Sequence, residues 1–262
     1  MLRSLWIAKT GLDAQQTSLD TISNNLANVS TTAYKRVRPV FEDLLYQNIN
    51  QPGGRSSQDT ELPNGLMLGA GTKVVATQKN FSQGNMSTTE NSLDFMIQGD
   101  GFFEIQRPDG TLAYSRNGQF SLDENGRIVT SGAGFPLQPE MNVPPEAKSI
   151  TISQQCEVTV QLPGQGAGVA IGQLTISDFI NPAGLEPIGQ NLFTETGVSG
   201  APVQGNPGVN GLGIIVQGAL ETSNVNVTEE LVNMIESQRV YEMNSKVIST
   251  VDQMLSFITQ QL

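Results

Sequence analysis

The 262-residue chain contains no histidine and a single cysteine, and both features limit its chemistry. Histidine is the commonest general base and transition-metal ligand, so only carboxylates, lysine and tyrosine remain for such roles. The lone Cys156 excludes an internal disulfide, and no histidine is present to activate its thiol. Enzymes without histidine exist, so this composition disfavours catalysis without excluding it. With the motifs considered below, our expectation is no catalytic residue, no cofactor and no metal site, and an inert thiol at Cys156.

Basic residues and long apolar runs are also scarce. The chain has 14 Lys and Arg against 25 Asp and Glu, a net charge of -11. Because phosphate binding needs clustered cations, this balance excludes a DNA or RNA partner. No run approaches the roughly 20 apolar residues of a membrane-spanning helix. The opening MLRSLWIAKTGLDAQQ has only LWIA where a signal peptide would have its apolar region. We expect a protein that is not membrane-embedded and is either cytosolic or exported without a cleaved leader.

Glycine and proline are nearly absent from both ends of the chain. All 13 prolines lie between Pro39 and Pro207, no glycine follows Gly218, and only Gly11 precedes Pro39. Long helices are therefore possible at both ends, whereas turn-forming residues interrupt the middle every few positions. This layout predicts an α+β fold with a β-rich body inserted between two terminal helices.

Apolar residues near the start recur every seven positions, which is the spacing of a coiled-coil-like helix. The series is Leu5, Leu12, Leu19 and Leu26, with Ala8, Gln15, Ile22 and Val29 three positions after each. The polar run at 28–32 then favours the end of the helix, because short polar side chains compete for backbone hydrogen bonds.

Near the other end, six residues again lie seven apart: Val227, Met234, Tyr241, Ile248, Leu255 and Leu262. Leu231 lies four residues after the first of them. A helix over 227–262 would be roughly 54 Å long, with Asn226 or Thr228 as its N-cap. Polar residues between the apolar ones suit a helix that has several different neighbours. The alternative is that both helices pack on the surface of the central domain.

The middle of the chain reads as short antiparallel strands. FFEIQRPDGTLAYS and GQFSLDENGRIVTSG each place a turn sequence, PDG or ENG, between apolar runs, which predicts two hairpins. SITISQQCEVTVQL and GVAIGQLTISDF alternate in the same way. Residues 47–72 show neither helical nor strand periodicity, which indicates a linker or an extended loop that orders against neighbouring subunits.

Candidate catalytic and binding motifs are incomplete. GDGFFE at 99–104 has Glu104 where a dinucleotide-binding motif needs its third glycine. DENG lacks the glycine and the final acid of a calcium loop. Asp94, Asp100 and Glu104 could supply a glycosidase pair, but nothing in the sequence brings two of them to the required separation.

Several long segments resemble the bacterial flagellar axial proteins of the rod and hook. They are ANVSTTAYKR at 27–36, LDFMIQGDGFFEI and YSRNGQFSLDENGRIVTSGAGFPLQP in the middle, and LETSNVNVTEELVNMIESQRVYEMNSKVISTVDQML at the end. Within that family, SLWIAKTGLDAQQ and VFEDLLYQ are most similar to the distal rod members. At Ala33 the chain departs from the family, which usually has glycine there.

The resemblance implies terminal helices that pair and stack into a helical homopolymer, a rigid tube that serves as drive shaft and export channel. It implies a polymerisation domain (1–30 plus 227–262), an extended junction (31–72 plus 200–226) and an outer β-rich domain (73–199). Residues 47–72 would stiffen the tube. The implied subunit contacts are Leu5, Leu12, Leu19, Ile22, Leu26, Leu231, Met234, Tyr241, Ile248, Leu255 and Leu262. The implied junction residues are Asn28, Thr31, Tyr34, Lys35 and Arg36.

The implied partners are further copies of the chain, proximal rod and hook subunits or junction proteins, and the basal-body ring proteins. The implied location is the periplasm-spanning basal body, reached by flagellar type III export without a cleaved signal peptide. Alternatives are a hook or proximal rod subunit of the same family, or, from other classes, a β-rich adhesin or a cell-wall hydrolase.

Overall fold

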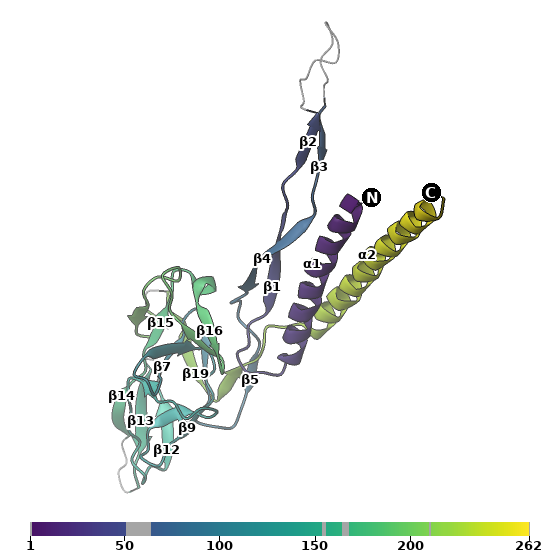
Figure 1. Cartoon of the computed structure of the whole chain (residues 1–262). Coiled ribbons are helices and arrows are strands. Elements are labelled where there is room, and N and C mark those ends of the chain that lie inside the picture. The colour runs from purple at the N-terminus through teal and green to yellow at the C-terminus, as the bar shows by residue number, and fades with distance from the viewer. Residues whose placement is uncertain (1, 51–63, 154–155, 164–167, 210, 262) are drawn as a thin grey trace. The chain divides into compact units, whose positions relative to one another are not determined.

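The computed structural model describes residues 2–50, 64–153, 156–163, 168–209 and 211–261 (Figure 1). The chain divides into two compact units. Unit 1 comprises Met1–Ala27, Val37–Lys79 and Asn226–Leu262, and unit 2 comprises Asn28–Arg36 and Asn80–Val225. Terminal helices and antiparallel strands between them confirm the expected α+β class.

Unit 1 contains two long helices, α1 (Leu2–Ala27) and α2 (Val227–Gln261). They contact each other and run in opposite directions, so both chain ends lie at the same end of the pair (Figure 1). The backbone N–H of Thr228 donates to the side-chain oxygen of Asn226 at 3.1 Å, which confirms Asn226 as an N-cap. Within the described part of the chain, neither helix is long and apolar enough to cross a membrane.

The rest of unit 1 is a ribbon of paired strands. Strand β1 (Val37–Asp43) pairs antiparallel with β4 (Thr72–Lys79), and β2 (Gln47–Asn50) pairs with β3 (Leu66–Leu68). Residues 47–72, which we expected to be a linker or an extended loop, begin and end in these paired strands. The paired strands satisfy each other's backbone hydrogen-bonding groups across the ribbon. Residues 51–63 of that segment lie outside the described residues.

Unit 2 is built from short antiparallel strands. Its largest sheet has the order β11-β7-β8-β17-β16, and a three-stranded sheet has the order β12-β13-β14. The first sheet comprises β7 (Phe103–Gln106), β8 (Leu112–Ser115), β11 (Leu137–Gln138), β16 (Glu186–Gly189) and β17 (Leu192–Thr194). The second comprises β12 (Ser149–Ile152), β13 (Glu157–Gln161) and β14 (Val169–Gln173).

Among the described residues of unit 2, four two-stranded pairs and one short helix complete the fold. The pairs are β9 (Phe120–Leu122) with β10 (Ile128–Thr130), β15 (Ile176–Asp178) with β18 (Val203–Gly205), β6 (Phe95–Gln98) with β19 (Ile214–Gln217), and β5 (Met86–Thr88) with β20 (Ala219–Glu221). The 3-10 helix η1 (Pro182–Gly184) precedes β16.

Both predicted hairpins form. Strands β7 and β8 join through a turn in which Gly110 has a φ of 81°, and β9 and β10 join through one in which Gly126 has a φ of 76°. Glycine suits both positions because it adopts positive φ without steric cost. Asp123 of the second turn forms an ion pair with Arg127 at 3.1 Å, as in an ordinary hairpin turn.

The core of unit 2 is aromatic and aliphatic. Phe95, Phe103 and Phe120 pack together with ring centroids 5.3 to 5.6 Å apart, within a larger cluster of aliphatic side chains. Cys156 is buried in the same cluster, and burial raises the pKa of its thiol. The thiol therefore stays protonated near neutral pH, in agreement with the inert role expected for it.

One glycine sets how closely two segments of this core approach. Gly118 accepts a hydrogen bond from the backbone N–H of Phe95 at 2.9 Å. A Cβ atom added at Gly118 would lie 1.5 Å from the carbonyl oxygen of Phe95. Backbone atoms cannot yield at that distance as a flexible side chain would, so this position requires glycine.

We predict that Gly118→Ala lowers the free energy of unfolding by at least about 2 kcal/mol, because it forces the two backbones apart in a packed core. The matched control is Gly197→Ala, where a new Cβ meets nothing within 4 Å and φ is not positive. That control should be neutral or slightly stabilising. Urea unfolding of the full-length variants measures both, and equal stabilities would contradict the prediction.

Candidate functional site: the helix pair and the buried junction

Small and polar residues spaced seven apart take part in the contact between α1 and α2. The hydroxyls of Ser18 and Ser237 lie 3.4 Å apart. A Cβ atom built on Gly11 would lie 3.1 Å from the side-chain nitrogen of Asn244. Neither contact involves a large apolar side chain, so the two helices approach closely.

Asn25 connects α1 to two other elements of unit 1, β1 and α2. Its side-chain amide donates to the carbonyl of Val37 at 2.8 Å and to the carboxylate of Glu230 at 3.3 Å. Its side-chain oxygen accepts the backbone N–H of Val37 at 2.9 Å. Asn25 and Glu230 are both buried. A single amide thus links the end of α1 to the first residue of β1 and to the first turn of α2.

The expected subunit-contact residues differ in burial within one copy. Ile22 is buried, and Leu231 and Tyr241 are exposed. Half-buried side chains make up most of the set: Leu5, Leu12, Leu19, Leu26, Met234, Ile248 and Leu255. Leu262 lies outside the described residues. The seven-residue spacing of Gly11, Ser18 and Asn25 could not be recognised in the sequence as a helix contact, because these residues are small or polar and carry no apolar signal.

The first part of the junction is a tight turn that follows α1. The backbone N–H of Thr31 donates to the carbonyl of Asn28, and the hydroxyl of Thr31 donates to the side-chain oxygen of Asn28, both at 3.1 Å. The backbone N–H of Tyr34 then donates to the carbonyl of Thr31 at 3.3 Å. These bonds explain why Asn and Thr stand where the helical pattern stops.

Lys35 is buried within unit 2, where its ammonium group forms an ion pair. Its side chain is 1% exposed, and its ammonium donates to the carboxylate of Glu221 at 2.6 Å and to the carbonyl of Ser82 at 2.8 Å. The other oxygen of Glu221 accepts from the guanidinium of Arg116 at 3.0 Å. The backbone N–H of Gly84 also donates to Glu221, at 2.8 Å. The single buried carboxylate of Glu221 therefore forms ion pairs with two buried cations.

This arrangement shifts the titration of Glu221. Burial by itself raises the pKa of the carboxyl group, but the charges of Arg116 and Lys35 and the hydrogen bonds outweigh it, so the pKa lies below its usual value of 4.5. Glu221 is therefore charged at neutral pH. The cluster is a buried ion network that joins distant segments of unit 2.

Asn224 completes the junction. Its side-chain oxygen accepts the backbone N–H of Arg36 at 2.7 Å, and its amide donates to the carbonyls of Asn80 and Ser82 at 2.9 and 3.0 Å. The backbone N–H of Asn80 donates to the carbonyl of Arg36 at 2.8 Å. Residues 28–36, 80–84 and 221–225 are thus joined although they are far apart in the sequence.

Ala33 has a left-handed backbone in this junction, with a φ of 57°. Its side chain is 4% exposed, and its backbone N–H donates to the carbonyl of Glu221 at 2.8 Å. A left-handed conformation costs a residue with a Cβ about 1 to 2 kcal/mol. The surrounding hydrogen bonds hold Ala33 in this conformation.

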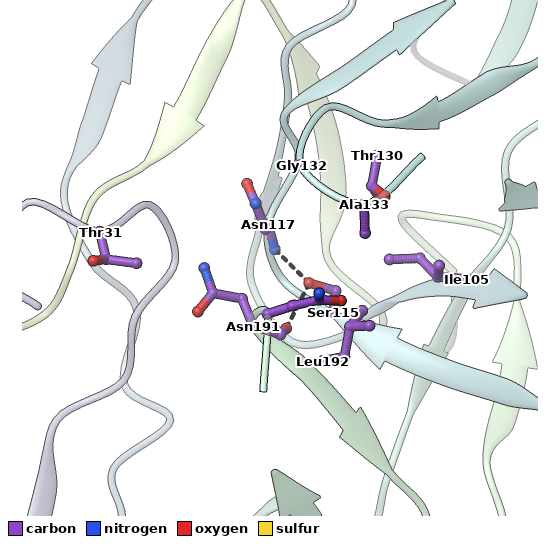
Figure 2. Close-up of a pocket in the computed structure, with 10 residues that line it drawn as sticks. Thr31, Ile105, Ser115, Asn117, Thr130, Gly132, Ala133, Asn191 and Leu192 are labelled. Carbon is purple, nitrogen blue, oxygen red and sulfur yellow. Dashed lines mark hydrogen bonds between the residues drawn. The ribbon is translucent and has the colours of Figure 1, made fainter. Parts of the chain in front are cut away.

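A pocket of about 350 Å³ lies beside the junction in unit 2 (Figure 2). Thr31, Ser115 and Asn191 are among the residues that line it, and the hydroxyl of Ser115 donates to the carbonyl of Asn191 at 2.8 Å. None of its lining residues is ionisable. In the described part of the chain, no group of three or more Cys, Asp and Glu side chains could hold a metal ion.

Three family models match this chain. They are described as the flagellar hook protein FlgE/F/G D1 domain (residues 96–160), the flagellar basal body rod FlgEFG protein C-terminal (216–261) and the flagella basal body rod protein (5–35).

Relatives named flagellar basal-body rod protein FlgG match over almost the whole chain. The one from Buchnera aphidicola subsp. Schizaphis graminum is 54% identical over 260 residues, which are 99% of this chain and all of the relative. The one from Borreliella burgdorferi is 49% identical and covers 97% of each chain. The one from Bacillus subtilis is 38% identical and also covers 97% of each chain.

The chain therefore belongs to the family of bacterial flagellar rod and hook proteins, which are structural proteins and not enzymes. Its full-length similarity to rod proteins named FlgG makes it a structural subunit of the distal rod of the flagellar basal body. The resemblance inferred from the sequence motifs is confirmed.

We predict that Ala33→Gly changes the free energy of unfolding by less than about 1 kcal/mol, because relieved strain offsets a lost buried methyl of about 0.8 kcal/mol. Ala33→Val should cost about 2 kcal/mol or more, since a β-branched residue both disfavours positive φ and overfills a buried site. Urea unfolding compares the two, and a tolerated valine would show that the turn is less constrained.

We predict that Glu221→Gln lowers the free energy of unfolding by about 3 to 5 kcal/mol at pH 7, because two buried cations lose their anion. A carboxyl group with a lowered folded pKa stabilises the fold above its unfolded pKa and loses that effect as pH falls through the folded value. The difference between wild type and variant should therefore be full at pH 7 and shrink below about pH 4.5. Denaturation curves at pH 7, 5 and 3 test this, and a difference independent of pH would contradict it.

Proposed function

We propose that this distal rod subunit polymerises through α1 and α2 into a rigid helical tube that joins the rod to the hook. The observation that carries the proposal is the apolar surface that one copy leaves exposed on α2. It includes Val232, Ile235, Met243 and Val247, which are 44 to 60% exposed. Burying such side chains gains roughly 1.5 to 3 kcal/mol each, which a further copy can supply.

The expected seam residues fit contacts between copies better than contacts within one copy. Small and polar residues take part in the contact between α1 and α2, while Leu231 and Tyr241 keep exposed apolar surface that neighbouring helices can cover. We propose Leu5, Leu12, Leu19, Ile22, Leu26, Leu231, Met234, Tyr241, Ile248 and Leu255 as residues at or supporting these contacts, with Leu262 as a further candidate. Helices with several neighbours in this way form a coiled-coil-like array.

The junction residues have two roles in this proposal. Asn28, Thr31 and Lys35 shape the turn and fasten it within unit 2. Tyr34 and Arg36 are half-buried and follow the same turn, and we propose that their remaining surface meets neighbouring copies. In the polymer, residues 1–30 plus 227–262 form the polymerisation domain, 31–72 plus 200–226 the junction, and 73–199 the outer domain.

The strand ribbon of unit 1 supports a stiffening role for residues 47–72. Leu45, Tyr46 and Ile49 are 52 to 90% exposed, and Leu66 and Met67 on the partner strand are about half exposed. Apolar side chains this open are typical of surfaces that pack against another protein. We propose that the ribbon packs on neighbouring copies and limits bending of the tube.

We propose as partners the proximal rod subunits, the hook subunits or their junction proteins, and the rings around the rod. Export through the flagellar type III apparatus without a cleaved signal peptide would bring the subunit to the periplasm-spanning part of the basal body. The central channel of the tube would then pass later subunits.

Electron microscopy of basal bodies from a strain that lacks this gene, with and without a restored copy, tests the proposal. The expected result is a rod shortened at its distal end and without a hook, which the restored gene repairs. A complete rod that lacks only its hook would move the protein one position outward, and intact basal bodies would refute the proposal.

We predict that Tyr241→Ser raises the concentration needed for polymerisation about tenfold or more, because an apolar contact between copies is lost. The side chain is 40% exposed, so the stability of the monomer should change little. The matched comparison is Ile22→Ser, which should also destabilise the monomer because Ile22 is buried. Sedimentation of polymer and urea unfolding of monomer separate the two effects, and unaltered assembly of Tyr241→Ser would argue against this contact.

A further inference from the structure

In the described part of unit 1, the last turns of α2 extend past the start of α1 and have no helix opposite them. The paired positions Gly11 with Asn244, Ser18 with Ser237, and Asn25 with Glu230 define the antiparallel register. In that register the first residue of α1, Leu2, lies opposite Gln253. Because the two helices have the same rise per residue, residues 254–261 of α2 extend beyond the start of α1.

This overhang is apolar and uncharged. Met254, Phe257 and Ile258 are 58%, 61% and 43% exposed. With Thr250 and Gln253 they line a shallow hollow of about 450 Å³. The segment QMLSFITQ at 253–260 contains no charged residue. Glu230, Ser237, Asn244 and Val251 are spaced seven residues apart along α2. Ile258 continues this spacing and lies beyond the level of Leu2, the first residue of α1.

An apolar side chain projects from the start of α1. Trp6 is 58% exposed, and the ammonium of Lys9 lies 5.4 Å from its ring centroid. It is the only tryptophan in the chain. A tryptophan this exposed gains more from burial than most side chains, because of its large apolar area.

The geometry of unit 1 indicates how two copies would use these surfaces. The start of α1 and the end of α2 lie at the same end of the helix pair (Figure 1). In the register above, Trp6 lies opposite Ser249, eight residues before Phe257. Two copies placed side by side with their helix pairs parallel, and shifted along the axis by roughly 12 Å, therefore bring Trp6 of one copy to the level of the overhang of the other. Copies stacked end to end would not do so.

We propose that the α2 overhang, formed by Met254, Phe257 and Ile258, is a receptor for the start of α1, with Trp6, of a laterally adjacent copy. The proposal rests on the polymer described under the proposed function and specifies one contact in it. The occupant is a second copy because the overhang continues the seam on which α1 packs within one chain. The contact would set the axial stagger between neighbours.

Fluorescence of Trp6 tests this contact directly, since no other tryptophan contributes. We expect the emission of wild-type protein to shift to shorter wavelength when monomer becomes polymer. Phe257→Ser should raise the critical concentration about tenfold or more and leave the emission of any polymer at the monomer position. Phe257→Leu, which keeps an apolar side chain, should behave nearly as wild type.

Circular dichroism of dilute monomer controls for folding, because an exposed Phe257 should be replaceable without loss of helicity. A wild-type polymer in which Trp6 keeps its monomer emission would overturn this contact and leave the proposed function intact. Normal assembly of Phe257→Ser with a normal Trp6 shift would also overturn it. A wild-type protein that forms no polymer at any concentration would overturn both proposals.

Discussion

The carboxylate of Glu221 is the interaction on which the junction of this protein depends. It lies between the cations of Lys35 and Arg116 and also accepts a backbone N–H from Gly84. These groups come from segments that are up to 186 residues apart in the chain. Buried charges are tolerated only when they are paired. The segments that carry Lys35, Arg116 and Glu221 must therefore meet before any of these three charges can be buried. The network therefore makes the junction cooperative.

The backbone around this network is equally constrained. Ala33 keeps a left-handed conformation while its N–H bonds to Glu221, and the amide of Asn191 donates to the carbonyl of Thr32 at 3.0 Å. Asn224 bonds to Arg36, Asn80 and Ser82. Asn191 and Asn224 thus hold together segments of unit 2 that are far apart in the sequence.

The helix pair differs from the junction, because its contact relies on close approach of the backbones. Its internal contact uses Gly11, Ser18 and Asn25, which are small or polar and allow close approach of the backbones. Large apolar side chains such as Ile235 and Met243 remain exposed in one copy. A monomer optimised for its own stability would bury those residues first. Exposed apolar side chains such as these are expected in a subunit whose neighbouring copies cover them after assembly.

Much of this architecture could be predicted from the sequence alone. The distribution of glycine and proline indicated helices at the ends and strands between them, and PDG and ENG marked two hairpins, because these signals act over a few residues. The terminal motifs, with others in the middle, indicated the family. Only the tertiary structure decided which side chains meet: that Lys35 is buried against Glu221, and that Gly11, Ser18 and Asn25 lie against α2. Such contacts join distant segments, and periodicity within one segment carries no information about which face a distant segment will cover.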